Sequence, residues 1–222
     1  MKKKQRNRYG VAVSLLAAFA LWTALVCCVD VQPIGPDGSA VGFAAVNEMV
    51  HDLTGVHMGL YVATDLLSLV PVAFVVGFAV LGLAQWMKRK SFLRVDGSIL
   101  LLGGYFVAVM ALYVFFEVVV INYRPVLING VLEASYPSST TMLVMCVMPT
   151  AWLQLNARMK SGGAKKLVTG TITAYTAFMV VGRLISGVHW FSDIVGGALL
   201  SAGLAMLYGA AAYDLLQTET GK

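Results

Sequence analysis

Six stretches of the chain are almost continuously apolar, and each is about as long as a helix that crosses a membrane. Such a helix needs about 20 predominantly apolar residues. The second stretch is long enough to tilt or to break near Pro71, and the fourth is short. The pattern predicts an all-α bundle of six transmembrane helices in one domain, residues 1–222, with spans over Tyr9–Val29, His57–Trp86, Ser98–Tyr123, Thr141–Asn156, Leu167–Gly187 and Trp190–Leu216.

The composition excludes several other classes of protein. Of the 222 residues, 59% are hydrophobic and 12% are charged, whereas a soluble domain has about 45–50% apolar and about 25% charged residues. So large an apolar fraction cannot be buried in one small core, and it also excludes a disordered chain. The three cysteines lie in apolar runs, so we expect neither a disulfide framework nor a metal site.

Basic residues mark one side of the predicted bundle. Every lysine and arginine except Arg124 and Arg183 lies before the first span, between the second and third, between the fourth and fifth, or at the C-terminus. The positive-inside rule places these segments and both termini in the cytoplasm. The net charge of +5 is therefore a topology signal, and no nucleic-acid partner is expected. We expect a multi-pass plasma-membrane protein whose first span is a retained helix and not a cleaved signal peptide.

The longest outer segment, residues 30–56, contains two local signals. A cluster of turn-forming residues runs from Pro33 to Gly38. The stretch from Val41 to Leu53 then has the pattern of a short amphipathic helix. Such a helix typically lies in the membrane interface with its apolar face toward the lipid, and we expect this position here.

Polar residues that a membrane span normally excludes gather on the outer side. Ionisable residues within or at the edge of a span are energetically costly, so they are candidates for function. The third span contains Glu117 and is followed by Arg124, and the fifth ends near Arg183. The sixth begins with His189 and Asp193, and Ser138, Ser139 and Thr140 precede the fourth. Because successive spans alternate in direction, all of these positions face the same side, and we expect one site there.

His189 and Asp193 are spaced so that they share a face if both lie on a helix. The carboxylate would then accept the Nδ1–H of the imidazole, which fixes the tautomer and leaves Nε2 free as a base or nucleophile. An isolated pair of this kind is more often a simple helix N-terminal feature, because acidic residues favour the first turn.

The arginines and the serine-rich segment suggest an anion site when they are taken together. Guanidinium groups bind phosphate oxygens in a bidentate manner, and free backbone N–H groups at the start of the fourth span would add donors. Taken singly, Arg124 and Arg183 also fit lipid-headgroup anchors, and Ser138 fits a plain helix N-cap.

Three strings resemble the signatures of the type 2 phosphatidic acid phosphatase superfamily. Residues 182–193, Gly-Arg-Leu-Ile-Ser-Gly-Val-His-Trp-Phe-Ser-Asp, resemble the third signature, SRxxxxxHxxxD, with glycine in place of the serine. Residues 117–125 resemble the first, KxxxxxxRP, with Glu117 in place of the lysine. Residues 137–140 are similar to the second, PSGH, with Ser139 for glycine and Thr140 for histidine. The resemblance covers residues 57–216.

This resemblance implies a membrane-embedded lipid phosphatase that forms a phosphohistidine and uses no metal or cofactor. By the resemblance, His189 would attack phosphorus and Asp193 would orient it. Arg124, Arg183 and Ser138 would hold the phosphate oxygens, together with backbone amides near Ser139 and Thr140. The substrate would be a lipid phosphate or diphosphate of the bilayer, hydrolysed on the extracytoplasmic side.

Thr140 stands where the family has a histidine that protonates the leaving group, and threonine cannot act as an acid at neutral pH. General acid catalysis contributes about 10²–10⁴ in rate. Three explanations compete: the chain binds lipid phosphate without turnover, another residue such as His51 or His57 donates the proton, or the substrate needs little help. A phosphate leaving group, with a second pKa of about 6, departs far more easily than an alkoxide, with a conjugate acid near ~15.7. A polyprenyl or other lipid diphosphate is therefore the expected substrate.

Three further residues are candidates for supporting roles. Glu117 could orient an arginine or bind a cationic headgroup, but we expect it foremost to be a buried ion-pair partner. His57, Tyr61 and Asp65 follow one another at intervals of four residues on the second span. Asp65 could support the site or replace the missing proton donor, and the alternative is a hydrated polar face.

Two classes of function remain open from the sequence. The first is a lipid phosphatase or diphosphatase, which the pair of His189 and Asp193 and the two arginines favour. The second is a catalytically silent protein that binds or transports lipid phosphate, which the replacements at Glu117 and Thr140 favour. We expect the enzyme, because a nucleophile and a phosphate clamp are harder to explain otherwise than a missing acid.

Overall fold

The computed structural model describes residues 3–160 and 162–221, without the side chains of Lys3, Lys4 and Thr220. Helices dominate this part of the chain, and its only β-pairings are isolated bridges. Two short 3₁₀ helices, Pro36–Gly38 and Phe92–Arg94, lie in connecting segments. The α-helices are α1 (Lys3–Cys28), α2 (Ala44–Thr54), α3 (Met58–Leu67), α4 (Leu69–Arg89), α5 (Gly97–Val118), α6 (Ser139–Arg158), α7 (Gly162–Ile185) and α8 (Phe191–Thr220).

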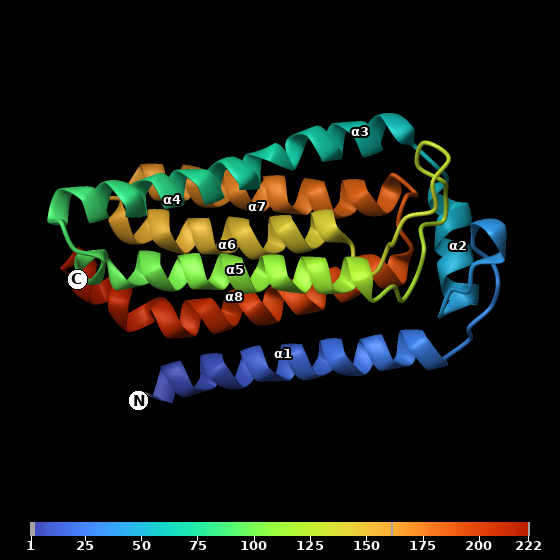
Figure 1. The fold of residues 1–222 in the computed structure, drawn as a ribbon, viewed down its shortest axis with the longest axis horizontal. Coiled ribbons are helices and arrows are strands. Elements are labelled where there is room, and N and C mark those ends of the chain that lie inside the picture. The colour runs from blue at the N-terminus through green and yellow to red at the C-terminus, as the bar shows by residue number, and fades with distance from the viewer. Residues whose placement is uncertain (1–2, 161, 222) are drawn as a thin grey trace.

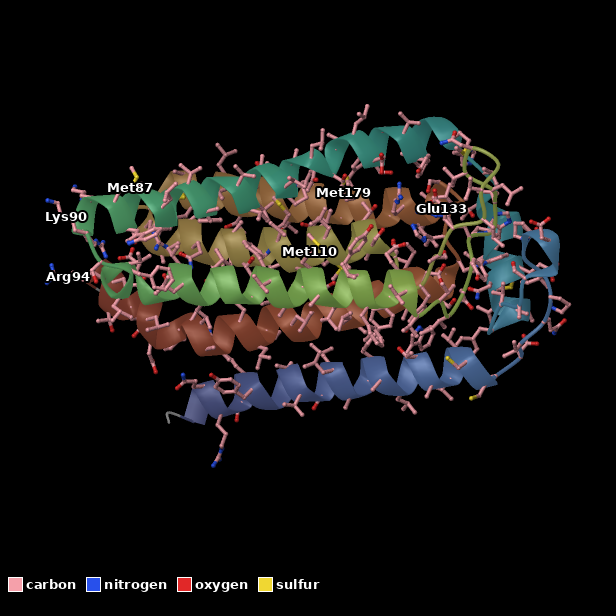
Figure 2. All side chains as sticks on the ribbon, in the orientation of Figure 1. Met87, Lys90, Arg94, Met110, Glu133 and Met179 are labelled. Atoms are coloured by element: carbon pink, nitrogen blue, oxygen red, sulfur yellow. The ribbon has the colours of Figure 1, made fainter. Side chains whose placement is uncertain are left out.

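The long helices run side by side along one axis (Figure 1). The helix α3 continues into α4, and α6 lies among α4, α5, α7 and α8, with which it makes contact. The short helix α2 lies across one end of the bundle, next to the loop between α5 and α6. Both chain termini lie at the opposite end. We call these the α2 end and the basic end, the latter marked by Lys90 and Arg94, which Figure 2 labels.

Five helical stretches are long and apolar enough to cross a membrane, which supports a multi-pass membrane protein. They are Gln5–Cys28, Met58–Arg89, Gly97–Val118, Gly162–Ile185 and Phe191–Glu219. The remaining long helix, α6, is less apolar, but it is the most enclosed. Its buried residues include the polar Thr140, Thr141, Thr150 and Gln154. Because other helices surround α6, its side chains need not be compatible with lipid.

The observed helix boundaries confirm one predicted feature and correct another. The second span breaks at Ser68, close to Pro71 as predicted. Pro71 sits in the first turn of α4, where its missing N–H leaves no hydrogen bond unmade. The third span ends at Val118 and not at Tyr123. The loop that follows folds back on itself through bridges between Tyr123 and Ala134 and between Ile128 and Val131.

The loop that leads into α6 is anchored by Tyr136, which is only 1% exposed. Its ring stacks on Phe19 of α1, with centroids 6.4 Å apart, and meets Phe116 of α5 edge-on. Its hydroxyl lies 2.6 Å from Thr23 Oγ1. An added Cβ at Gly196 of α8 would lie 2.6 Å from the same ring, so glycine is needed there for the close approach. Three helices therefore fix the segment that precedes Ser138.

The predicted amphipathic helix is present as α2, and its two faces differ as expected. Val46, Met49 and Leu53 are exposed, which agrees with an apolar face toward the lipid. The opposite face contains Asn47, which is fully buried and bonded to the first turn of α8. The helix is thus also a packing element behind the residues that open α8.

Candidate active site

The residues predicted for the outer face meet at the α2 end of the bundle. Two loops converge there, one between α5 and α6 and the other between α7 and α8. The backbone N–H of Ser138 donates to the carbonyl of Asp193 at 3.0 Å, which ties the two loops together. Glu133 of the first loop is labelled at this end in Figure 2, far from Lys90 and Arg94.

His189 lies in a tight turn before α8 and is only 3% exposed. The turn depends on Gly187, whose φ of +69° favours glycine, and an added Cβ there would lie 2.0 Å from the Gly55 carbonyl oxygen. The shared helical face, which requires both His189 and Asp193 to lie on a helix, is not formed. Trp190 is the N-cap of α8, and its N–H donates to Asp193 Oδ2 at 2.9 Å, so the helix begins after the histidine.

Ser135 stands between His189 and Asp193. The predicted direct hydrogen bond is absent, because His189 Nδ1 and Asp193 Oδ2 are 3.9 Å apart. The Ser135 Oγ lies 3.0 Å from Nδ1 and donates to Oδ2 at 2.5 Å. With that donation made, Oγ can only accept from the ring, so Nδ1 carries the proton and Nε2 presents a lone pair. A serine two residues before Pro137 gave no sequence signal for this role.

Asp193 is fully buried, and hydrogen bonds from several segments satisfy its carboxylate. Asn122, from the loop after α5, donates to Oδ1 at 3.1 Å, and Ser135 and the Trp190 N–H donate to Oδ2. Asn47 of α2 bonds to both the N–H and the hydroxyl of the neighbouring Ser192. A buried carboxylate needs such donors to remain charged, and sequence reasoning missed both asparagines.

Arg183 is 1% exposed and is held by α3. Its Nη1 donates to the Tyr61 carbonyl at 3.4 Å and to Thr64 Oγ1 at 3.3 Å, and its guanidinium carbon lies 4.7 Å from the centre of the Tyr61 ring. An added Cβ at Gly182 would lie 3.0 Å from Thr64 Cγ2. The glycine that replaces the family's usual serine therefore lets α3 approach and hold the arginine.

Arg124 has a different ion-pair partner from the one expected. Its Nε lies 3.0 Å from Glu133 Oε2, and its backbone N–H donates to the Glu133 carbonyl at the same distance. The expectation that Glu117 is a buried ion-pair partner is wrong, because Glu117 is exposed at the end of α5 and hydrogen-bonds Tyr113. The loop after α5 folds back and brings Glu133 to the arginine, which the sequence pattern did not indicate.

Apart from Arg124 Nε, whose contact with Glu133 is an ion pair without hydrogen-bond geometry, four buried polar atoms of this site have no hydrogen-bond partner among the described residues: Arg124 Nη1, Arg183 Nε, Ser138 Oγ and His189 Nε2. Buried donors without partners are rare in proteins and call for an explanation. Two guanidinium groups and a hydroxyl at the start of α6 provide positive charge and hydrogen-bond donors, which is the chemistry that binds a phosphoryl group. The site is therefore suited to an anion beside an imidazole nitrogen.

The imidazole is neutral in this setting. Burial, together with the positive charges of Arg124 and Arg183, lowers the pKa of His189 to about 4, although Asp193 acts in the opposite direction. The lone pair on Nε2 is therefore available at neutral pH. Such a nitrogen can act as a nucleophile toward a phosphorus atom held by the arginines.

A cavity of about 320 Å³ opens beside Thr140. Asp65 of α3, Tyr113 of α5 and Ser139 line it together with Thr140, and the rest of its wall is mostly apolar. Asp65 is thus placed on the same cavity as the threonine that replaces the family's acid. His57 is not: its side chain is exposed, and Nε2 lies 2.8 Å from the Thr54 carbonyl oxygen.

A second cavity of about 470 Å³ lies between α4 and α5. It shares Val75 and Phe106 with the cavity beside Thr140, so the two form one continuous apolar groove. The groove extends from Asp65 to Trp86, which corresponds to about 30 Å along a helix axis. This is about the thickness of the hydrocarbon core of a bilayer.

Fold and site together define a multi-pass membrane protein with an anion site beside a neutral histidine. Comparison with known families assigns it more narrowly. Residues 99–215, more than half of the chain, match the model of the PAP2 superfamily, and the chain belongs to that family. The resemblance of the three signatures to this family is thereby confirmed, and membership of the family supports phosphatase activity.

A solved structure has a similar fold. It is described as the crystal structure of the first transmembrane PAP2 type phosphatidylglycerolphosphate phosphatase from Bacillus subtilis. The similarity covers 91% of this chain and 95% of that chain, with a TM-score of 0.57 and 20% sequence identity. At this level of identity the match supports the fold alone. No curated protein matches the sequence.

Proposed function

We propose that the protein is a lipid phosphatase or diphosphatase that acts at the α2 end of a six-span bundle. The observation that carries the proposal is the set of four unpartnered buried atoms that includes His189 Nε2. In this arrangement α6 crosses the membrane within the shelter of its neighbours. The basic end, with both termini, faces the cytoplasm under the positive-inside rule, and the site opens on the extracytoplasmic side of the plasma membrane.

The proposed reaction has two steps. The Nε2 lone pair of His189 forms a bond to phosphorus while the bond from phosphorus to the leaving oxygen breaks. With a diphosphate the leaving group departs as the lipid phosphate anion, and with a monophosphate the leaving oxygen takes a proton from the carboxyl group of Asp65, which regains it in the second step. Water then attacks phosphorus, the P–N bond breaks, and one proton is released with the inorganic phosphate. Arg124, Arg183 and Ser138 hold the phosphoryl oxygens and stabilise their charge. No step uses a metal ion.

The chain of hydrogen bonds from His189 through Ser135 to Asp193, called the relay below, suits the first step. As the P–N bond forms, positive charge develops on the imidazole ring. The Nδ1–H then donates more strongly to Ser135 Oγ, which is itself hydrogen-bonded to the buried carboxylate of Asp193. Asp193 thereby stabilises the charged ring without a direct hydrogen bond to it.

The leaving group decides how much the missing histidine matters. A lipid diphosphate leaves as a lipid phosphate and needs little protonation, whereas a lipid monophosphate leaves as an alkoxide. In the second case Asp65, on the same cavity as Thr140, is the proposed proton donor. The groove between α4 and α5 would hold the hydrocarbon chain of either substrate, and its length suits a chain longer than one leaflet.

The alternative is a protein that binds lipid phosphate without turnover. The replacement of the family's acid by Thr140 and of its lysine by the exposed Glu117 favours this alternative. The buried relay behind His189 favours the enzyme, because binding alone does not require an oriented nucleophile.

Phosphate release by the purified protein in detergent tests the proposal. A polyprenyl diphosphate, a phosphatidate and phosphatidylglycerolphosphate would be compared in the presence of chelator, with His189→Ala as the control. We expect chelator-resistant release, fastest from the diphosphate, that disappears in the variant. Release that survives in His189→Ala, or binding of all three lipids without release, would refute the enzyme.

A further inference from the structure

A second groove lies toward the basic end of the bundle, on a different face from the first. Two cavities of about 300 Å³ and about 420 Å³ share Arg8, Trp152, Leu153 and Gly209, so they are continuous. The helices α6 and α8 provide most of the lining, and α1 and α7 contribute Arg8 and Lys165. Nothing in the candidate active site involves these residues.

The groove has a polar half and an apolar half. The polar half is lined by Arg8, Lys165, Asn156, Tyr213 and Gln217. The apolar half extends along α6 and α8 past Pro149 and Met206 to Met145 and Ala202. From Asn156 to Met145 the groove runs about 16 Å along the axis of α6, which is about half of the hydrocarbon core. The dimensions match one leaflet and therefore one phospholipid.

The charge of the polar half is positive, and its side chains are held in place. Arg8 and Lys165 are partly buried, whereas Lys90 and Arg94 at the same end are exposed. The guanidinium carbon of Arg8 lies 4.8 Å from the centre of the Tyr213 ring, which fixes it over α8. None of the described residues that line the groove is acidic.

Trp152 marks the boundary between the two halves. Its Nε1–H donates to Thr169 Oγ1 at 2.7 Å, and Thr169 in turn bonds to the Lys165 carbonyl. Tryptophan is enriched at the level of lipid headgroups, because its ring is apolar and its N–H is polar. The position of Trp152 therefore agrees with a lipid whose phosphate lies near Lys165, in the polar half, and whose acyl chain lies in the apolar half on the other side of the indole ring.

We propose that this groove is a binding site for an anionic phospholipid of the leaflet at the basic end. The lipid phosphate lies between Arg8 and Lys165, and one acyl chain follows α6 and α8 toward Met145. Basic pockets between membrane helices bind anionic headgroups in this manner. The lipid is a structural ligand, separate from the substrate of the site at the α2 end.

Native mass spectrometry of the detergent-purified protein tests the proposal by lipid titration. Phosphatidylglycerol is the anionic probe, since its phosphate is a diester and offers no terminal phosphoryl group, and phosphatidylcholine is the zwitterionic control. The test variant is Arg8→Gln with Lys165→Gln. The matched control is Lys90→Gln with Arg94→Gln, which removes the same charge from the same end outside the groove.

We expect the affinity for phosphatidylglycerol to fall about 30-fold in the test variant, because each basic side chain contributes about fivefold. The control variant should stay within about twofold of the wild type. Equal losses in both variants, or equal affinity of the wild type for phosphatidylcholine, would overturn the proposal. Loss of phosphatidylglycerol in Arg124→Gln would place the lipid at the other site and overturn it as well. If the double variant does not fold, the affinity of Lys165→Gln alone for phosphatidylglycerol should fall about fivefold. An unchanged affinity of this variant would also overturn the proposal.

Discussion

Removal of the Ser135 hydroxyl is the most direct test of the relay between His189 and Asp193. In Ser135→Ala the carboxylate stays in place, because Asn122 and the Trp190 N–H still bond to it. The imidazole alone loses its partner, since 3.9 Å is too long for a direct hydrogen bond. The variant therefore leaves Arg124 and Arg183 unchanged and removes only the hydrogen bond to the imidazole of His189.

The size of the effect follows from the bond that is lost. A hydrogen bond to a charged group contributes about 1.5–3 kcal/mol, and about 1.36 kcal/mol corresponds to a tenfold change in rate. Because the imidazole becomes charged only as the P–N bond forms, the loss falls on kcat. We expect kcat to fall about 10- to 150-fold, while KM, which depends on the arginines, changes by less than about twofold.

The assay is steady-state phosphate release, with acid-quench measurement of the phosphoenzyme as a second readout. Slower formation of the phosphoenzyme at unchanged KM is the expected signature of a positioning residue. Ser135→Thr, which keeps the hydroxyl, is the matched control and should recover most of the rate. A Ser135→Ala enzyme with kcat within twofold of the wild type would refute the relay, as would a folded Ser135→Thr that is equally slow.

Four other predictions test separate parts of the site. Because the pKa of His189 is lowered to about 4, its neutral form persists as the pH falls from 7, and kcat/KM should decline only near pH 4; a decline centred at about pH 6.5 would contradict this. Arg183→Lys cannot keep the bonds to Tyr61 and Thr64 while facing a phosphate, so kcat/KM should drop at least about 100-fold, and a drop below tenfold in kinetic assays would argue against the clamp. Asp65→Asn should slow release from a lipid monophosphate by about 10² or more and from a diphosphate by less than tenfold; equal effects on both substrates would exclude Asp65 as the proton donor. Gly187→Ala places a Cβ 2.0 Å from the Gly55 carbonyl oxygen, so thermal unfolding should show a loss of several degrees, and an unchanged melting temperature would show that the turn relaxes freely.

The parts of the site that sequence predicted are those within short continuous motifs, Arg124 and Ser138 included. Arg183, His189 and Asp193 were recognisable because a short turn between two helices fixes their spacing. Ser135, Asn122 and Asn47 were not, because Ser135 and Asn122 reach Asp193, and Asn47 reaches the neighbouring Ser192, only after separate segments have folded together. No local pattern distinguishes a serine in a loop from one that bridges two catalytic side chains.

The fold was predictable to a similar extent and for related reasons. The lengths of the apolar runs located the long helices, because a helix in contact with lipid must be apolar over the thickness of the membrane. They placed the start of α8 to within one residue, at Trp190 against the observed Phe191, but they missed the end of α5 at Val118, after which the chain folds back as a loop. Glu117 was wrongly expected to be a buried ion-pair partner, because the loop after α5 folds back and brings Glu133 to Arg124 instead, and helical spacing cannot describe such a loop.

The polar interior of α6 has a consequence for how the protein is assembled in the membrane. Helices enter a bilayer one after another during synthesis, and each is admitted mainly on its own apolarity. With Thr140, Thr141, Thr150 and Gln154 on its buried surface, α6 is poorly suited to the lipid alone. Its main partners, α7 and α8, are synthesised after it. In the proposed six-span arrangement, α6, which begins at the proposed phosphate site, therefore depends for its own insertion on the two helices that follow it. The site would then be completed only once α8 is in place.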